Sequence, residues 1–155
     1  MSTGSAALLR DQPPSPRGGR AGAVDVGGLA VDPGFLDAWG DRTRTVWAAD
    51  SFAGLPAPDA AFPADADSTL HKLKPLAVSR SEVEQNFALY GLLDEQVAFL
   101  EGWFKDTLPT VRDRTWSVIR LDGDMYESTL EALENLYPGL ASGGFCIVDD
   151  YSFEP

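Results

Sequence analysis

Three aspartates stand at the ends of two apolar segments of the sequence. Asp122 closes WSVIRLD (residues 116–122), while Asp149 and Asp150 close GFCIVDD (residues 144–150). Their spacing is about one strand–helix–strand unit, so neighbouring parallel strands would bring the three carboxylates together. Two or three carboxylates, completed by water or substrate oxygens, suit Mg²⁺, whereas like charges packed without a cation are costly. The pattern predicts a metal site, with acids that cap helices or face water as the alternative.

A fourth aspartate and several aromatic residues suggest a site for a nucleotide-like cofactor. Asp50 closes the apolar segment TVWAAD (residues 45–50), and an acid in that position often accepts hydrogen bonds from ribose hydroxyls. Trp103, Phe104 and Trp47 could stack on an adenine ring. The alternatives are a loop-entry aspartate and aromatic side chains that belong to the core, and the residues alone leave both open.

His71 is the only histidine of the chain and stands in the loop sequence STLHKLKP. Histidine is the side chain that gains and loses a proton nearest neutral pH, which suits a general base. A single histidine is also often an ordinary surface residue. Its spacing from the aspartates does not decide between these interpretations.

The elements that must position these residues alternate along the chain. A capping box, Ser79 with Glu82, predicts a helix that buries Val83, Phe87 and Tyr90 and ends at Gly91. A short helix is expected from residue 105 up to the proline at 109, and another over the leucines at 130, 133 and 136. Strands are expected at residues 45–50, 96–102, 116–122 and 144–150, and a proline-rich loop from 51 to about 75.

Apolar strands that alternate with helices predict an α/β fold whose parallel sheet is covered on both faces. Ligands of such sheets bind beyond the carboxyl ends of the strands. In this sequence those ends carry Asp50, the corner at residues 101–103, Asp122 with Asp124, and Asp149 with Asp150. The expected fold therefore gathers these acids and the 101–103 corner at one edge.

Composition limits the classes of partner. The chain has 155 residues, 44% of them hydrophobic, and a formal charge of −12, so we expect one globular domain that binds neither nucleic acid nor a membrane. Cys146 is the only cysteine, which excludes an internal disulfide and favours a reducing compartment, the cytoplasm. Residues 1–22, rich in Pro, Gly, Ser and Arg, are expected to form a flexible arm before a domain at 23–155.

Three longer strings carry a resemblance to a known family. They are VWAADSFAGLP, LAVSRSEVEQNFALYGLLDEQVAFLEGWFKDTLP and VIRLDGDMYESTLEALENLYPGLASGGFCIVDDY. Together they resemble the macrocin and mycinamicin sugar O-methyltransferases of the TylF/MycF type over residues 35–152. The resemblance implies a Rossmann-like class I methyltransferase fold, S-adenosylmethionine and Mg²⁺ as cofactors, and a deoxysugar hydroxyl of a macrolide-like product as the methyl acceptor. A homo-oligomer stays open.

The resemblance also implies roles for single residues. LDGD and VDDY would supply the magnesium ligands, and the histidine ahead of LAVS would be the general base. ADSF would contribute the acid on the cofactor ribose, and EGWFKDTLP would border the adenine. The residues concerned are Asp122, Asp149 and Asp150 for the metal, His71 for the base, Asp50 for the ribose, and Gly102 with Trp103 for the adenine.

The sequence departs from the family pattern near both ends. The family carries ETGVWRGG on its first strand and turn, where this chain has AGAVDVGG and keeps only the pair Gly27 and Gly28 for close approach to the methionine part of the cofactor. The family also continues beyond VDDY, whereas this chain ends at Pro155. We therefore expect a partial domain with an incomplete sheet and impaired activity.

Two other functions fit parts of the sequence. An inactive remnant or an interaction module would explain the altered glycine loop. A phosphatase of the haloacid-dehalogenase type would use a strand-end D-x-D such as that in LDGD, together with the acids of IVDD. That chemistry needs a lysine between the two motifs, and the last lysine here is Lys105, ahead of both.

Overall fold

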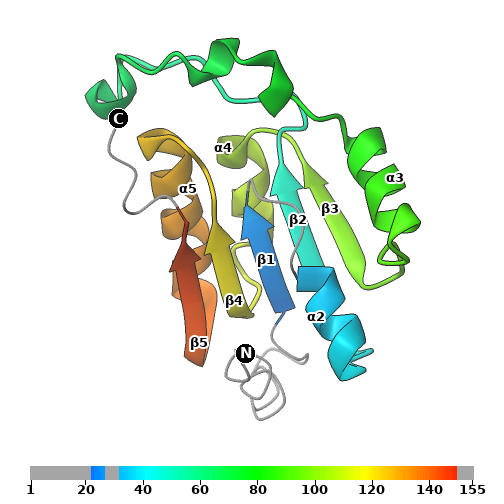
Figure 1. Ribbon diagram of the computed structural model, residues 1–155. Coiled ribbons are helices and arrows are strands. Elements are labelled where there is room, and N and C mark those ends of the chain that lie inside the picture. The colour runs from blue at the N-terminus through cyan, green and yellow to red at the C-terminus, as the bar shows by residue number, and fades with distance from the viewer. Residues whose placement is uncertain (1–21, 27–31, 150–155) are drawn as a thin grey trace.

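The computed structural model describes residues 22–26 and 32–149, whose five strands form one parallel sheet in the order β3-β2-β1-β4-β5 (Figure 1). Every neighbouring pair in this sheet runs parallel. The strands are β1 (Gly22–Val26), β2 (Val46–Asp50), β3 (Val97–Glu101), β4 (Trp116–Leu121) and β5 (Leu140–Val148). The expected parallel α/β architecture is confirmed, and all carboxyl ends meet at one edge.

Helices connect the strands on both faces of the sheet. They are α2 (Asp32–Trp39), α3 (Arg80–Leu89), α4 (Phe104–Thr107) and α5 (Tyr126–Leu136). From β1 the chain adds β2 and β3 on one side of the sheet, and it then crosses back to add β4 and β5 on the other side. Because the crossovers are right-handed, α2 and α3 cover one face of the sheet and α4 and α5 cover the other (Figure 1). No helix within the described ranges is long and apolar enough to cross a bilayer.

Single turns of 3₁₀-helix fill the connections between these elements. Three of them, η1 (Pro63–Asp65), η2 (Leu70–Lys72) and η3 (Lys74–Leu76), lie between β2 and α3, in the stretch expected to be loop. The other two, η4 (Leu108–Val111) and η5 (Tyr137–Gly139), follow α4 and α5.

The four expected strands correspond to β2, β3, β4 and β5, and their largest boundary difference is in β5, whereas β1 was not among the expected strands. This strand begins at Leu140, ahead of the expected start at residue 144. Leu140 pairs with Trp116 before the register shifts, and Gly143 has a φ of +80°. An irregularity that contains glycine interrupts the apolar pattern there, and for this reason the apolar pattern did not predict the first part of the strand.

The strand β1 is the central strand of the sheet. Val24 and Val26 are almost fully buried, and β1 pairs with both β2 and β4. Gly22, placed at the end of the expected arm, is the first residue of β1. Residues 1–21 lie outside the described part of the chain, so the flexible arm stays a prediction.

The main core lies between the sheet and the α4–α5 layer. It includes Trp116, Leu108 and Leu136, all fully buried. Trp47 packs edge-on against Trp116 with ring centroids 6.4 Å apart, and the Arg114 guanidinium lies 4.1 Å from the centroid of the Trp47 ring. Trp47 is therefore a core residue and not part of a ligand site.

The capping box at α3 is confirmed. The Glu82 amide donates to Ser79 Oγ at 3.3 Å, and the Ser79 amide donates to a Glu82 carboxylate oxygen at 3.0 Å. The Ser79 hydroxyl also donates to the Glu82 carboxylate at 2.6 Å, and this bond, together with the one from the Ser79 amide, lowers the pKa of Glu82. Val83 and Phe87 are buried as expected, but Tyr90 is exposed because the helix ends at Leu89.

Replacing Ser79 by Ala removes the acceptor for the Glu82 amide and is expected to lower the free energy of unfolding by about 1 kcal/mol. Urea denaturation followed by circular dichroism measures this change. Ser81→Ala, two residues further along in the first turn of α3, is the control and should change stability by less than about 0.5 kcal/mol. Equal effects of the two substitutions would contradict a specific capping role.

Candidate functional site

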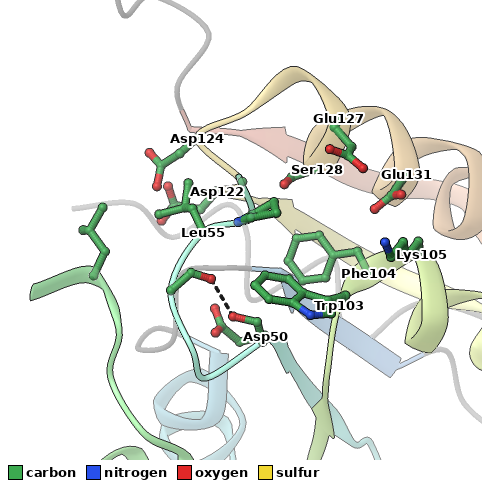
Figure 2. A pocket seen from close by; sticks show the side chains of 15 residues that line it. Asp50, Leu55, Trp103, Phe104, Lys105, Asp122, Asp124, Glu127, Ser128 and Glu131 are labelled. Atoms are coloured by element: carbon green, nitrogen blue, oxygen red, sulfur yellow. Dashed lines mark hydrogen bonds between the residues drawn. The ribbon is translucent and has the colours of Figure 1, made fainter. Parts of the chain in front are cut away.

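One cavity opens beyond the carboxyl ends of β2, β3 and β4 (Figure 2). We call it the edge cavity. Three groups of residues follow the strand ends and line it, and α5 and η3 add further side chains. The lining comprises Asp50, Ser51, Gly54, Leu55, Pro56, Leu76, Trp103, Phe104, Lys105, Asp122, Gly123, Asp124, Glu127, Ser128 and Glu131. The expected edge of the sheet is therefore also the place where a ligand fits.

Asp50 is held in the edge cavity by the turn that follows β2. Its Oδ1 accepts a hydrogen bond from the Phe52 amide at 2.6 Å, and Phe52 adopts a left-handed backbone with φ of +52°. The Ser51 hydroxyl donates to the Gly54 carbonyl at 2.6 Å, which closes the same turn. Burial raises the pKa of Asp50, and the Phe52 hydrogen bond opposes that rise. A ligand that donates to this carboxylate would relieve the cost of burying it.

The corner after β3 depends on a glycine. Gly102 has a φ of +136°, and a Cβ atom there would lie 2.8 Å from Thr107 Cγ2. Its amide donates to the Asp50 carbonyl at 2.9 Å, which ties the ends of β2 and β3 together. Gly102 does not line the edge cavity, but the corner it forms places Trp103, 38% exposed, and Phe104 in the wall. Figure 2 shows these two rings side by side near Asp50.

The ends of β4 and β5 bring two of the three expected metal ligands together. Arg120 Nη2 donates to Asp122 Oδ2 at 3.1 Å and also to Asp149 Oδ2. Asp150 lies outside the described residues. Among those that the structure does describe, no three histidine, cysteine, aspartate or glutamate side chains are arranged to hold a metal. The expected convergence of Asp122 and Asp149 is confirmed, and their shared counter-charge is a guanidinium.

Sequence reasoning missed Arg120, although a signal for it was present. Residues two apart in a strand point to the same face, so Arg120 and Asp122 of VIRLD must project together. An arginine so close to a predicted cation site is a candidate partner for the same carboxylates.

A second carboxylate pair was also missed. Glu127 and Glu131, one helical turn apart on α5, line the edge cavity together with Lys105. Burial raises the pKa of both, and the charges of Asp59 and Asp65 add to the effect on Glu127. Their i, i+4 spacing after a strand end was the available signal. The carboxylates of Glu127 and Glu131 could accept hydrogen bonds from N–H groups of a ligand in the cavity.

His71 and the glycine pair have different outcomes. His71 lies in η2 and is not among the residues that line the edge cavity. Its Nδ1 is buried without a hydrogen-bond partner in the described structure, so its role as a base stays a prediction. Gly27 and Gly28 lie outside the described residues, and their role near the methionine part of a cofactor is untested.

Comparison with known proteins decides the family. The family model described as macrocin O-methyltransferase (TylF) matches residues 22–155. The chain belongs to the TylF family. Demethyldecarbamoylnovobiocin O-methyltransferase of Streptomyces niveus is 53% identical over 124 residues, which are 79% of this chain and 47% of that protein. Mycinamicin III 3''-O-methyltransferase of Micromonospora griseorubida is 49% identical over 122 residues, 76% of this chain and 48% of that one.

A solved structure confirms the fold of this TylF-family chain. The O-methyltransferase NovP superposes with a TM-score of 0.81 at 48% identity, over 86% of this chain and 58% of NovP. The class I methyltransferase fold implied by the resemblance is thereby confirmed. The chain spans about half the length of the two relatives above. The family assignment leaves the phosphatase alternative without support.

Asp50→Asn is expected to raise the Tm at pH 8. Because the pKa of Asp50 is raised in the folded state, protonation of its carboxyl group stabilises the folded state. This contribution to stability is fully present below the ordinary pKa of aspartate and is lost as the pH rises through the raised folded-state pKa. The amide keeps an oxygen for the Phe52 N–H and carries no charge. Thermal unfolding should give a higher Tm for Asp50→Asn than for wild type at pH 8, and a smaller difference in Tm at about pH 4.

The exposed Asp67 supplies the matched control, since Asp67→Asn removes one charge from the surface. Its Tm should follow wild type at both pH values. A lower Tm of Asp50→Asn at pH 8 would show that burial of this carboxylate is not costly.

Proposed function

We propose that this chain forms the cofactor-binding part of an S-adenosylmethionine-dependent O-methyltransferase that acts on a sugar hydroxyl of a glycosylated natural product. Family membership supports the reaction class, and the printed names of the relatives support the acceptor class. The observation that carries the proposal is the placement of Asp50 and Trp103, from two strand ends, in the wall of one cavity. A cytoplasmic location and a small-molecule partner belong to the same proposal.

The edge cavity offers complementary groups to each part of the cofactor. The Asp50 carboxylate would accept hydrogen bonds from the ribose hydroxyls, which suits a buried acid held by its own turn. Trp103 and Phe104, beyond the Gly102 corner, would contact the adenine. Gly27 and Gly28 would allow the backbone to approach the methionine part.

The transfer itself requires a proton acceptor. S-adenosylmethionine, when bound, would supply the methyl group, and the acceptor hydroxyl would have to give up its proton to a group of the protein. His71 is the proposed base from the family motif. Asp124 is a second candidate, because it lines the edge cavity and His71 does not. Asp124 has a φ of +55°, so its position depends on a left-handed backbone.

Asp122, Asp149 and Asp150 are the residues that would hold Mg²⁺. The first two already share one cationic group, Arg120 Nη2, which shows that their oxygens can converge on a positive charge. When bound, the ion would lower the cost of ionising a sugar hydroxyl and help to orient it. Because Arg120 neutralises the same carboxylates, the guanidinium and the ion would compete for them.

Isothermal titration calorimetry with S-adenosylmethionine tests the cofactor proposal. Wild type should bind, and Asp50→Asn should bind at least tenfold more weakly, because hydrogen bonds to a charged acceptor contribute about 1.5–3 kcal/mol. Asp67→Asn is the control and should bind as wild type does. A folded wild type that binds nothing would contradict the proposal and favour the inactive or interaction-module alternative.

Titration with Mn²⁺, followed by the loss of the free-ion electron paramagnetic resonance signal, tests the metal proposal. Asp122→Asn should abolish binding at concentrations that saturate wild type. Arg120→Gln should tighten binding several-fold, because it removes the competing positive charge. Arg112→Gln, an exposed arginine that donates to the Glu134 carbonyl, is the control. Equal binding by wild type and Asp122→Asn would exclude a metal at these carboxylates.

A further inference from the structure

The segment between β2 and α3, residues 51–78, runs across the carboxyl ends of the strands (Figure 1). We call it the 51–78 segment. It contains no strand and only three one-turn helices, and most of its side chains are exposed. Phe52 and Asp65 are its two buried residues. A segment of this kind has little apolar area to hold it in place.

Asp65 is buried, with 5% exposure, and reaches the first turn of α5. Its Oδ1 accepts from the Tyr126 amide at 2.8 Å, and its Oδ2 accepts from the Glu127 amide at 2.9 Å. The helix has no cap of its own, because Met125 stands at the N-cap without a side-chain hydrogen bond. The carboxylate therefore satisfies two helix N–H groups from a distant part of the sequence.

Charge strengthens this contact. The N-terminus of a helix carries a partial positive charge, and a carboxylate that accepts two amide hydrogen bonds there is in its preferred setting. The rings of Phe62 and Tyr126 add a contact with centroids 6.4 Å apart. Asp65 and Phe62 thus attach the middle of the 51–78 segment to α5.

The same attachment shapes the edge cavity from two sides. Ser51, Gly54 and Leu55 at the start of the segment and Leu76 near its end line the cavity. Glu127 and Ser128, in the first turn of α5, line the opposite wall. The start and end of the segment also touch, since a Cβ on Gly54 would lie 3.3 Å from Ala77 Cβ. Fixing the middle of the segment therefore fixes the cavity rim that its two ends form.

We propose that Asp65 is a positioning residue of this site: its carboxylate, bonded to the Tyr126 and Glu127 amides, holds the 51–78 segment over the edge cavity and so sets the affinity for the ligand. The inference rests on the proposed function, because S-adenosylmethionine is the ligand expected in the cavity. Asp65 is not among the residues that line the edge cavity, so it would act through the segment and α5. His71 is carried by the same segment, and its position depends on the same contact.

Hydrogen exchange by NMR on the whole chain tests the contact directly. Asp65→Asn keeps the size of the side chain but faces one helix N–H with an NH₂ group. The amides of Tyr126 and Glu127, and the amides bonded within the segment, such as Ser68 and Leu73, should then exchange at least tenfold faster. Amides of β4 should keep their wild-type rates. Asp65→Glu, which keeps the charge and both acceptor oxygens, should recover part of the protection.

Calorimetry with S-adenosylmethionine on the same samples separates positioning from simple helix capping. Asp65→Asn should bind at least tenfold more weakly, Asp65→Glu should fall between it and wild type, and Asp67→Asn should match wild type. A faster exchange at Tyr126 and Glu127 with unchanged affinity would overturn the proposal, because Asp65 would then be only a cap. Unchanged exchange in the 51–78 segment would overturn it as well.

The outcome for the proposed function can be read separately. If wild type binds no S-adenosylmethionine, the proposed function fails, and the exchange rates of the 51–78 segment alone then decide whether Asp65 holds it. If wild type binds and exchange in the segment does not respond to Asp65→Asn, the function stands and the positioning role is wrong.

Discussion

The parallel pairing of β1 with both β2 and β4 is the constraint on which the site depends. Because all five strands run the same way, their carboxyl ends lie at one edge, and the turns that follow them must share that space. Asp50, the Trp103 corner and Asp122 come from distant parts of the sequence and line one cavity for this reason. The strand that makes this possible is short, and its buried residues Val24 and Val26 belong to the main core.

The edge cavity concentrates carboxylates, and the structure compensates for them in different ways. Asp122 and Asp149 share the Arg120 guanidinium, and Asp65 is stabilised by helix amides. Asp50, Glu127 and Glu131 keep raised pKa values because burial disfavours their charged forms. The Phe52 amide and the Lys105 charge only partly offset this effect of burial, and a ligand with hydrogen-bond donors or a cation in the cavity would stabilise these three acids further.

The 51–78 segment illustrates how a loop gains a defined position without an apolar core. It is rich in proline and alanine, Phe52 is its only buried large apolar side chain, and it packs through Phe52 at one end and Asp65 in the middle. A single carboxylate on a helix N-terminus provides directional hydrogen bonds that apolar contacts would not provide. The cost is that the rim of the cavity depends on one residue that lies outside it.

Local pattern was enough to predict β2 to β5, α3 to α5, the capping box at Ser79, the parallel α/β class and the family, but not β1. It also indicated that Asp122 and Asp149 would converge, because strand periodicity and spacing are properties of the chain itself. Tertiary structure alone showed that the Arg120 guanidinium also reaches Asp149, that Trp47 packs against the main core, and that Asp65 caps α5. Each of these depends on which elements pack together in space, and no local pattern encodes contacts between residues so far apart in the chain.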